Sequence, residues 1–481
     1  MSVPQSTQST SPASSTTQDV GELSPTQLLE LRLLKAQNLA TEAGPGPAIE
    51  ALLSTVREHA DFADGWQQLA DWYRSLGDSA GLLEATGQLA TLRLDDAATL
   101  AAHGEALARV GKRNDAERLF DRALKLDATS TFAGFWLFDL LFEEQRLTEA
   151  GRILKTLKEH ASGDPFLLGR EAQLAAALDD KDSANDRLSE ICLSPGDVRW
   201  PLHAAAHALR KAGWRYDVRE VLEAVLERPN VNPDAGSLWM RVTILDGHMP
   251  EDIELRELSN RNAAGLHAVA TIGEAFEEAG HSDHAVEFVL RNQQWLRERV
   301  ELWGMGGYVL ARALRYRDVV AWMSDWRERL DAAAWMLVNL VEAYRATGDD
   351  AAAREVSQHA LTLPPDHGHD LHRIWLAFDR PFEQPELLEY VATAVSPDSL
   401  SDGVRFLQSL VTAMFDAGVG GGSQRSFDDV RSQVDAAISE YGLQLKRERG
   451  HRRMLRETIQ QITACYDGWT PRLWSVKRWL Y

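Results

Sequence analysis

Histidines are the residues of this sequence whose type and spacing come closest to a metal site. His203 and His207 are four residues apart in LHAAAH, so a helix would present both imidazoles on one face as two ligands of one ion. A second group, which follows two prolines at a junction, comprises His367, His369 and His372. The first pair has no obvious acidic third ligand, and a surface pair is the favoured interpretation. The second group is interpreted as a loop with capping roles, and whether it binds a metal is left open.

Glycine-rich stretches are the next candidates, because such loops can cradle phosphate groups. GMGG at 304–307 and GVGGG at 418–422 both lack the Lys-Ser/Thr that follows in a phosphate-binding loop. The favoured interpretation is close helix packing for the first stretch and a linker for the second. The sequence also lacks GxSxG and HExxH motifs. We therefore expect no catalytic residues, no cofactor and no metal, and an enzyme would need its site within residues 368–481.

Composition narrows the classes of partner. The 481 residues carry a formal net charge of −21, which argues against nucleic acid and against an anionic membrane surface. Cys192 and Cys465 match no zinc or redox spacing, and no apolar stretch approaches the ~20 residues of a spanning helix. Residues 1–24 are rich in Ser, Thr and Gln and predict a disordered arm rather than a secretory signal. The predicted location is the cytoplasm.

A repeat of 34 residues supplies the elements that would position any site. Six stretches in one phase start near Arg32, Trp66, Leu100, Gly134, Leu168 and Leu202. Seven positions further along stand Leu39, Tyr73, Leu107, Leu141, Ala175 and Leu209. Each unit has apolar residues at helical spacing on both sides of a turn, which Gly111 marks in the third unit. Neither helix can bury its apolar face alone, so neighbouring units must stack.

These units resemble the tetratricopeptide repeat. The residues that match the first half of the family pattern in the second unit are Trp66, Leu69, Ala70, Tyr73 and Gly77. The third unit matches nearly all of the pattern, with Gly104, Leu107, Gly111, Ala116, Phe120 and Ala123. The resemblance implies an all-α fold, a right-handed superhelical solenoid of about ten helix pairs.

The array is predicted over residues 25–367, in strict phase to about 232 and degenerate afterwards. Residues 368–481 are predicted to form a C-terminal helical cap. This region contains a Gly-rich linker at 417–426 and a basic, aromatic tail at 469–481. Ser426 is the expected N-cap of the helix after the linker.

A binding surface is the better functional candidate. In the tetratricopeptide family the first helix of each unit lines the concave groove. Carried over to this sequence, that geometry makes the groove aromatic in units four to six. The resulting partner-binding candidates are Phe132, Phe135, Phe142, Phe166, Trp200, His203, His207 and Arg210. The aromatic residues either form an exposed patch that binds a partner or pack against neighbouring helices.

The tail has an apolar face and a basic, aromatic face. Its candidate binding residues are Trp474, Lys477, Arg478 and Tyr481. It is predicted to cap the last helices or to dock onto an acidic surface, with a membrane-surface role disfavoured because one short helix binds weakly. The sequence leaves open which of these holds.

The function that the sequence favours is a non-enzymatic interaction scaffold or adaptor, which binds a peptide or helix of a partner protein in the groove. Acidic side chains at inner positions, such as Asp71, Glu105 and Asp139, predict an apolar or basic partner and no nucleic acid. The alternative is a regulatory or substrate-recognition subunit of an enzyme complex with a separate catalytic chain. The partner, the pathway and the oligomeric state stay open.

Overall fold

The computed structural model describes residues 24–379, 381–395, 402–447 and 449–466. These residues form helices, turns and irregular segments and contain no β-strand, which confirms the all-α prediction. The chain divides into two compact units, Met1–Ala116 and Glu117–Tyr481. The predicted tail residues 469–481 lie outside the described part of the chain.

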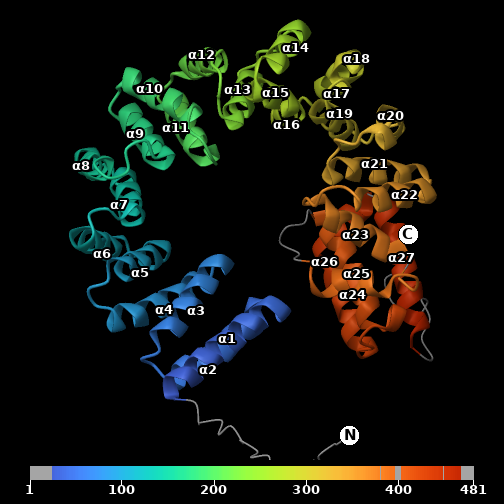
Figure 1. Cartoon of the computed structure of the whole chain (residues 1–481), viewed down its shortest axis with the longest axis horizontal. Helices are drawn as coiled ribbons and strands as arrows, with labels where there is room; N and C mark the ends of the chain where they lie inside the picture. Colours follow the sequence, from blue (N-terminus) through green and yellow to red (C-terminus); the bar gives the residue numbers. More distant parts are fainter. Residues whose placement is uncertain (1–23, 380, 396–401, 448, 467–481) are drawn as a thin grey trace, which may run out of the picture. The chain divides into compact units, whose positions relative to one another are not determined.

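Ten helix pairs follow one another from residue 25 to residue 360 of the described chain (Figure 1). The first five pairs are α1 (Pro25–Ala43) with α2 (Pro45–Glu58), α3 (Ala63–Leu76) with α4 (Ser79–Leu92), α5 (Ala97–Arg109) with α6 (Arg113–Leu126), α7 (Thr131–Glu143) with α8 (Leu147–Lys158), and α9 (Pro165–Ala177) with α10 (Lys181–Cys192). The next two are α11 (Arg199–Lys211) with α12 (Arg215–Leu226), and α13 (Pro233–Leu245) with α14 (Asp252–Arg261). The last three are α15 and α16 (Ala263–Ala270, Ile272–Glu278) with α17 and α18 (Ser282–Arg291, Gln293–Leu296), α19 (Val300–Arg312) with α20 (Tyr316–Trp322), and α21 (Ala334–Thr347) with α22 (Asp350–Ala360).

The period of the sequence is visible in where the first helices begin. Helices α3, α5, α7, α9, α11 and α13 start at residues 63, 97, 131, 165, 199 and 233, so each start follows the last by one full repeat period. In the second unit the first helices α7, α9, α11 and α13 follow one another along one side of the row, and α8, α10 and α12 along the other (Figure 1). Side chains at one repeat position therefore recur along one side.

Apolar burial holds each pair together. In α7 and α8 the side chains of Phe138, Leu154 and Leu157 are at most 3% exposed, and burying one such side chain contributes about 1.5–3 kcal/mol. Gly134 permits the close approach of the two helices, because a Cβ there would lie 2.6 Å from the Leu157 side chain. A larger residue at this position would force α7 away from α8.

Turns and caps fix where each helix begins. Gly77, Gly111 and Gly213 close their turns with φ of 71°, 78° and 95°, a conformation that favours glycine. Asn232 and Asn262 use their side-chain oxygens as N-caps of α13 and α15. Their Nδ2 groups donate to two backbone carbonyls of the preceding segment, at 2.9–3.1 Å. One amide thus caps a new helix and anchors it to the previous unit.

The GMGG stretch lies inside α19 and serves packing. A Cβ at Gly306 would meet the Trp322 ring at 2.3 Å, and one at Gly304 would meet Met336 at 2.8 Å. Trp322 also donates its indole N–H to the Trp303 carbonyl at 2.7 Å. Glycine is therefore needed for close contact with α20 and α21, as the sequence interpretation expects.

The spacing of the repeat persists past residue 360. Helix α23 (Gly368–Asp379) begins one repeat period after the start of α21 and packs on α21 and α22. Helices α24 (Pro385–Thr393), α25 (Asp402–Asp416), α26 (Phe427–Arg447) and α27 (Arg449–Ala464) follow. Buried side chains of α25, including Phe406, Leu410 and Met414, lie among α24, α26 and α27. Ser426 caps α26 through the Asp429 backbone N–H at 3.3 Å.

Candidate functional site

Three consecutive first helices line one cavity, which we call the aromatic cavity. It encloses about 350 Å³, and its lining residues are Phe132, Phe135, Trp136 and Asp139 of α7, Phe166 and Arg170 of α9, and Trp200 of α11. All seven lie within the unit that begins at Glu117. The cavity therefore has a mostly aromatic wall and one ionic pair.

The repeat itself positions the three outermost rings. Phe132, Phe166 and Trp200 are separated by one repeat period each and are the second residue of α7, α9 and α11. Their side chains are 44%, 41% and 44% exposed. Phe166 and Trp200 stack with ring centroids 5.7 Å apart and an interplanar angle of 17°. Regular stacking of the units thus aligns three exposed aromatic side chains.

Capping residues fix where α7 and α9 begin. The Ser130 hydroxyl caps α7 by accepting from the Ala133 N–H at 3.4 Å. Asp164 caps α9 by accepting from the Phe166 N–H at 2.7 Å, and Pro165 occupies the first position. Gly169 lets α9 approach α11, because a Cβ there would lie 3.2 Å from the Pro201 Cα. That approach brings Phe166 next to Trp200.

Arg170 forms the floor of the aromatic cavity. Its side chain is only 8% exposed, and its Nε and Nη2 donate to the two carboxylate oxygens of Asp139 at 3.0 and 2.7 Å. Its Nη1 donates to the Phe166 carbonyl at 3.2 Å. The guanidinium lies 4.3 Å from the Phe135 ring centroid and 4.6 Å from that of Trp200. Arg170 therefore ties three helices together with all three of its nitrogen atoms engaged.

The floor of the cavity carries little net charge, because the charges of Arg170 and Asp139 oppose each other. Burial raises the pKa of Asp139, while the hydrogen bonds and charge of Arg170 oppose that shift. Because Arg170 is already paired, it offers no bidentate site to an incoming carboxylate. The remaining surface of the cavity is aromatic. Such a site selects for an apolar group rather than for an anion.

Four of the residues predicted for the groove come together here: Phe132, Phe135, Phe166 and Trp200. The other four lie elsewhere. Phe142 is half-buried and stacks on Phe138 at 5.4 Å. His203 and His207 are exposed on α11, and Arg210 is bound bidentately by Asp246 at 2.8 and 2.9 Å. Partial desolvation of the His203 ring by its neighbours and the charge of Arg241 lower the pKa of His203.

Three lining residues were not among the predicted partner-binding residues: Trp136, Arg170 and Asp139, the last of which was named only as an acidic inner position. A usable signal existed for two of them. Asp139 and Arg170 carry opposite charges and are separated by slightly less than one repeat period, which places them on adjacent first helices about one turn apart. Arg74 and Glu105 show the same offset and form an ion pair at 3.0 Å in the first unit. Charge pairs at this offset mark stacked first helices.

The second histidine group lies at the contact between α21 and α23. His372 is fully buried, and its Nε2 donates to the Ala334 carbonyl at 2.8 Å. Burial lowers its pKa to about 4. His369 is also buried, and His367 stacks on Trp335. Within the described residues no three His, Cys, Asp or Glu side chains are grouped to hold a metal ion.

Trp474, Lys477, Arg478 and Tyr481 of the tail lie outside the described residues, so their role stays a prediction. Among the helices that the structure does describe, none combines the length and apolar character that crossing a membrane requires.

No protein-family model matches the sequence, and no curated protein does either. The chain is similar to a number of solved structures, among them the following three. The Cut9–Hcn1 hetero-tetramer of APC/C has 13% identity and a TM-score of 0.30, covering 95% of this chain and 97% of that one. Naa15/Naa10 bound to HypK-THB has 12% identity and a TM-score of 0.28, covering 91% and 79%. The TPR domain of P58(IPK) has 16% identity and a TM-score of 0.21, covering 75% and 98%.

The assignment of the fold rests on this chain's own helices. Six first helices begin at intervals of one repeat period, each is followed by a second helix, and the turn glycines take the expected backbone conformation. The protein is an all-α array of stacked helix pairs, and its first helices recur at the period that makes the sequence resemble the tetratricopeptide repeat.

Proposed function

We propose that the protein is a non-enzymatic interaction scaffold that binds an apolar segment of a partner protein in the aromatic cavity. One observation carries the proposal: three aromatic side chains at the same repeat position, Phe132, Phe166 and Trp200, are each more than 40% exposed on adjacent helices. Contiguous apolar surface of this kind marks interaction sites, and Trp and Tyr are frequent hot-spot residues.

The ionic floor defines the chemistry of the partner. Asp139 balances the charge of Arg170 and occupies its Nε and Nη2, so the cavity offers no unpaired cation to a terminal carboxylate. Aliphatic or aromatic side chains of a partner can cover the exposed rings without leaving a charge buried and unpaired. A peptide or an amphipathic helix that presents two or three apolar side chains on one face matches a row of rings along three helices.

The double variant Phe166→Ala/Trp200→Ala tests the proposal. We expect it to lower the affinity of the native partner by about 30-fold or more, since a hot spot contributes about 2 kcal/mol or more. The matched control is Tyr216→Ala, which removes a ring that is 69% exposed on the second helix α12. The partner is first isolated by affinity capture from the source cells, and its affinity for each purified variant is then measured by calorimetry.

Two outcomes would contradict the proposal. One is equal affinity of the wild type and the double variant, with both melting at the same temperature. The other is equal loss of affinity in the Tyr216→Ala control. If the captured partner is an enzyme, the protein acts as a subunit that recruits it, and the same variants test the contact.

A further inference from the structure

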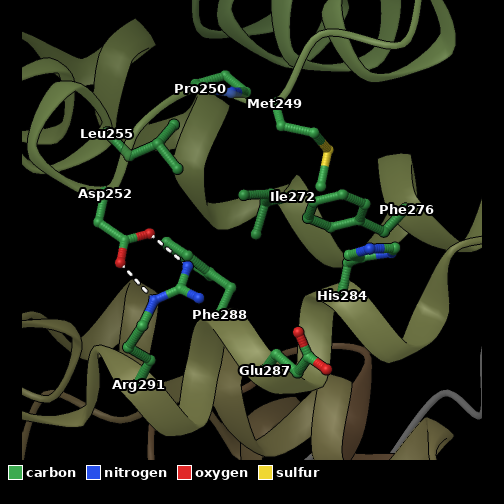
Figure 2. Close-up of a pocket in the computed structure, with 10 residues that line it drawn as sticks. All are labelled: Met249, Pro250, Asp252, Leu255, Ile272, Phe276, His284, Glu287, Phe288 and Arg291. Atoms are coloured by element: carbon green, nitrogen blue, oxygen red, sulfur yellow. Dashed lines mark hydrogen bonds and ion pairs between the residues drawn. The ribbon is translucent and has the colours of Figure 1, made fainter.

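A second cavity lies on α14, α16, α17 and the loop before α14 (Figure 2). We call it the 249–291 cavity, and its lining residues are Met249, Pro250, Asp252, Leu255, Ile272, Phe276, His284, Glu287, Phe288 and Arg291. None of these residues lines the aromatic cavity. The cavity encloses about 130 Å³.

Its floor is apolar and firmly packed. Leu255, Ile272, Phe276 and Phe288 are at most 4% exposed, so their positions are fixed by the core. Met249 extends over the cavity from the loop and is 50% exposed (Figure 2). An engineered apolar cavity of about 150 Å³ accommodates one benzene ring. The 249–291 cavity therefore has room for one branched aliphatic side chain.

One exposed apolar residue lies at the opening. Met249 lines the cavity and is 50% exposed, and Leu245 and Ile253, four residues before and after it in the sequence, are 40% and 63% exposed. Methionine is flexible and polarizable, and it adapts to the shape of an incoming group. This arrangement extends the apolar floor to the protein surface, where a partner side chain can enter.

The charges around the cavity are predominantly acidic. Asp252 holds Arg291 through two hydrogen bonds of 2.6 and 2.8 Å, so that cation is neutralised (Figure 2). Glu287 is exposed on α17, one helical turn before Arg291, and its carboxylate adds a second negative charge beside that cation. The segments 249–256 and 281–291 together contain five acidic residues and two arginines. This local excess of negative charge favours a cationic neighbour.

We propose that the 249–291 cavity is a second docking site, which binds a basic peptide segment of a partner by inserting one Leu, Ile or Met side chain. Lys or Arg residues on either side of that anchor pair with Glu287 and the neighbouring acidic side chains. The site lies chiefly on the second helices α14 and α17, whereas the aromatic cavity lies on first helices. The protein can therefore hold two different segments at once, and this site does not depend on the aromatic cavity.

Fluorescein-labelled synthetic peptides test the proposal on the full-length protein by fluorescence anisotropy. The first peptide has a central Leu with two Lys on each side. One sister peptide has Ser in place of Leu, and another has Glu in place of every Lys. We expect the Lys–Leu peptide to bind about tenfold more tightly than either sister and to weaken as ionic strength rises. Glu287→Lys should weaken its binding about tenfold, and Met249→Ala about threefold.

The controls separate this site from general charge and from the aromatic cavity. Glu220→Lys makes the same charge reversal at an exposed position of the second helix α12, and Phe166→Ala/Trp200→Ala removes the aromatic cavity. Both should bind the Lys–Leu peptide as the wild type does. The proposal is overturned if no peptide binds, if Ser replaces Leu without loss, or if Glu220→Lys weakens binding as much as Glu287→Lys.

Discussion

Two places in the second unit use the same three chemical groups and differ in exposure. In the aromatic cavity, Arg170 lies between Asp139 and the Trp200 ring. Between α21 and α23, Arg345 donates to both carboxylate oxygens of Asp379, at 2.9 and 2.6 Å, and lies 4.2 Å from the Trp375 ring centroid. Trp200 is 44% exposed, whereas Trp375 is 9% exposed. One arrangement of Arg, carboxylate and Trp thus joins helices in both places, and only the first leaves its ring accessible to a partner.

In both places the Arg–Asp pair joins stacked helices. Whether the adjacent tryptophan ring stays exposed for binding depends on the side chains around it. At Arg345 both charges are buried, with side-chain exposures of 7% and 9%. At Arg170 the cation is buried but the Asp139 side chain is 37% exposed. The buried pair should therefore dominate stability, and the half-exposed one should serve a binding surface. Four predictions test this contrast.

The largest effect is expected for Arg345→Ala. It leaves the Asp379 carboxylate buried without its partner, which costs about 3–5 kcal/mol. Thermal and urea unfolding followed by circular dichroism measure the loss. Arg312→Ala is the control, because its pair with Glu277 is exposed at 61% and 41% and should cost about 1 kcal/mol or less. Equal destabilisation by the two variants would contradict the contrast.

The second-largest effect is expected from acid, which should lower the stability of the fold through the buried His372. The pKa of His372 is lowered from 6.5 in the unfolded chain to about 4 in the fold. Between these values the unfolded state binds more protons, so stability falls as the pH drops from about 6.5 to 4. The expected loss is about 3 kcal/mol at the acid end, at about 1.4 kcal/mol per pKa unit. Urea unfolding at several pH values measures it, and His372→Gln should flatten that part of the profile.

Arg170→Ala should have a smaller effect on stability, of about 1–2 kcal/mol, because water can solvate the exposed part of Asp139. Its effect on binding should be larger, since Arg170 holds the Phe135 and Trp200 rings in place. Arg170→Lys keeps the charge but loses the bidentate geometry, and it should restore stability only in part. A loss as large as that of Arg345→Ala would remove the distinction between the two places.

The smallest effect on stability is expected for Trp200→Ala, at about 0.5 kcal/mol or less beyond the loss of its stacking on Phe166. Trp375→Ala, the matched change at the buried cluster, should cost about 3–5 kcal/mol. Melting temperatures of the two variants give the comparison directly. Trp200→Ala should nonetheless weaken partner binding, so that stability and binding separate at this residue.

The fold was largely predictable, because a regular period translates directly into stacked helices. Six first helices begin where the phase of the repeat requires. The pattern was harder to read after residue 232, although α13 still begins in phase and the period is first broken after residue 262. There α15 begins at Ala263, earlier than one full period after the start of α13, and the first helix is interrupted at Thr271. The repeat was hardest to recognise after residue 367. Helix α23 begins one repeat period after α21, but its side chains differ from the pattern of the earlier units.

The site was predictable where it depends on repeat position and not where it depends on side-chain geometry. Phe132, Phe166 and Trp200 share a position, so their proximity follows from stacking. The floor formed by Arg170 and Asp139 depends on side-chain contacts across α7, α9 and α11, and Gly169 permits the close approach of α9 to Pro201 of α11. Phe142 occupies a groove position in the pattern, yet local packing on Phe138 turns it away from the cavity. The 249–291 cavity has no sequence signature, since an irregular loop forms its roof.

The continued spacing at α23 has a consequence for where this chain can be divided. Gly368 lies against the backbone of α21, where a Cβ would meet the Trp335 nitrogen at 2.3 Å. Asp366 accepts from that same Trp335 N–H at 3.2 Å, and His372 reaches the Ala334 carbonyl. Cutting the chain at residue 367 would remove the packing of Gly368 and the hydrogen bond of His372 from α21. The last repeat and the C-terminal region share one packed contact, so a stable fragment of this chain has to contain both.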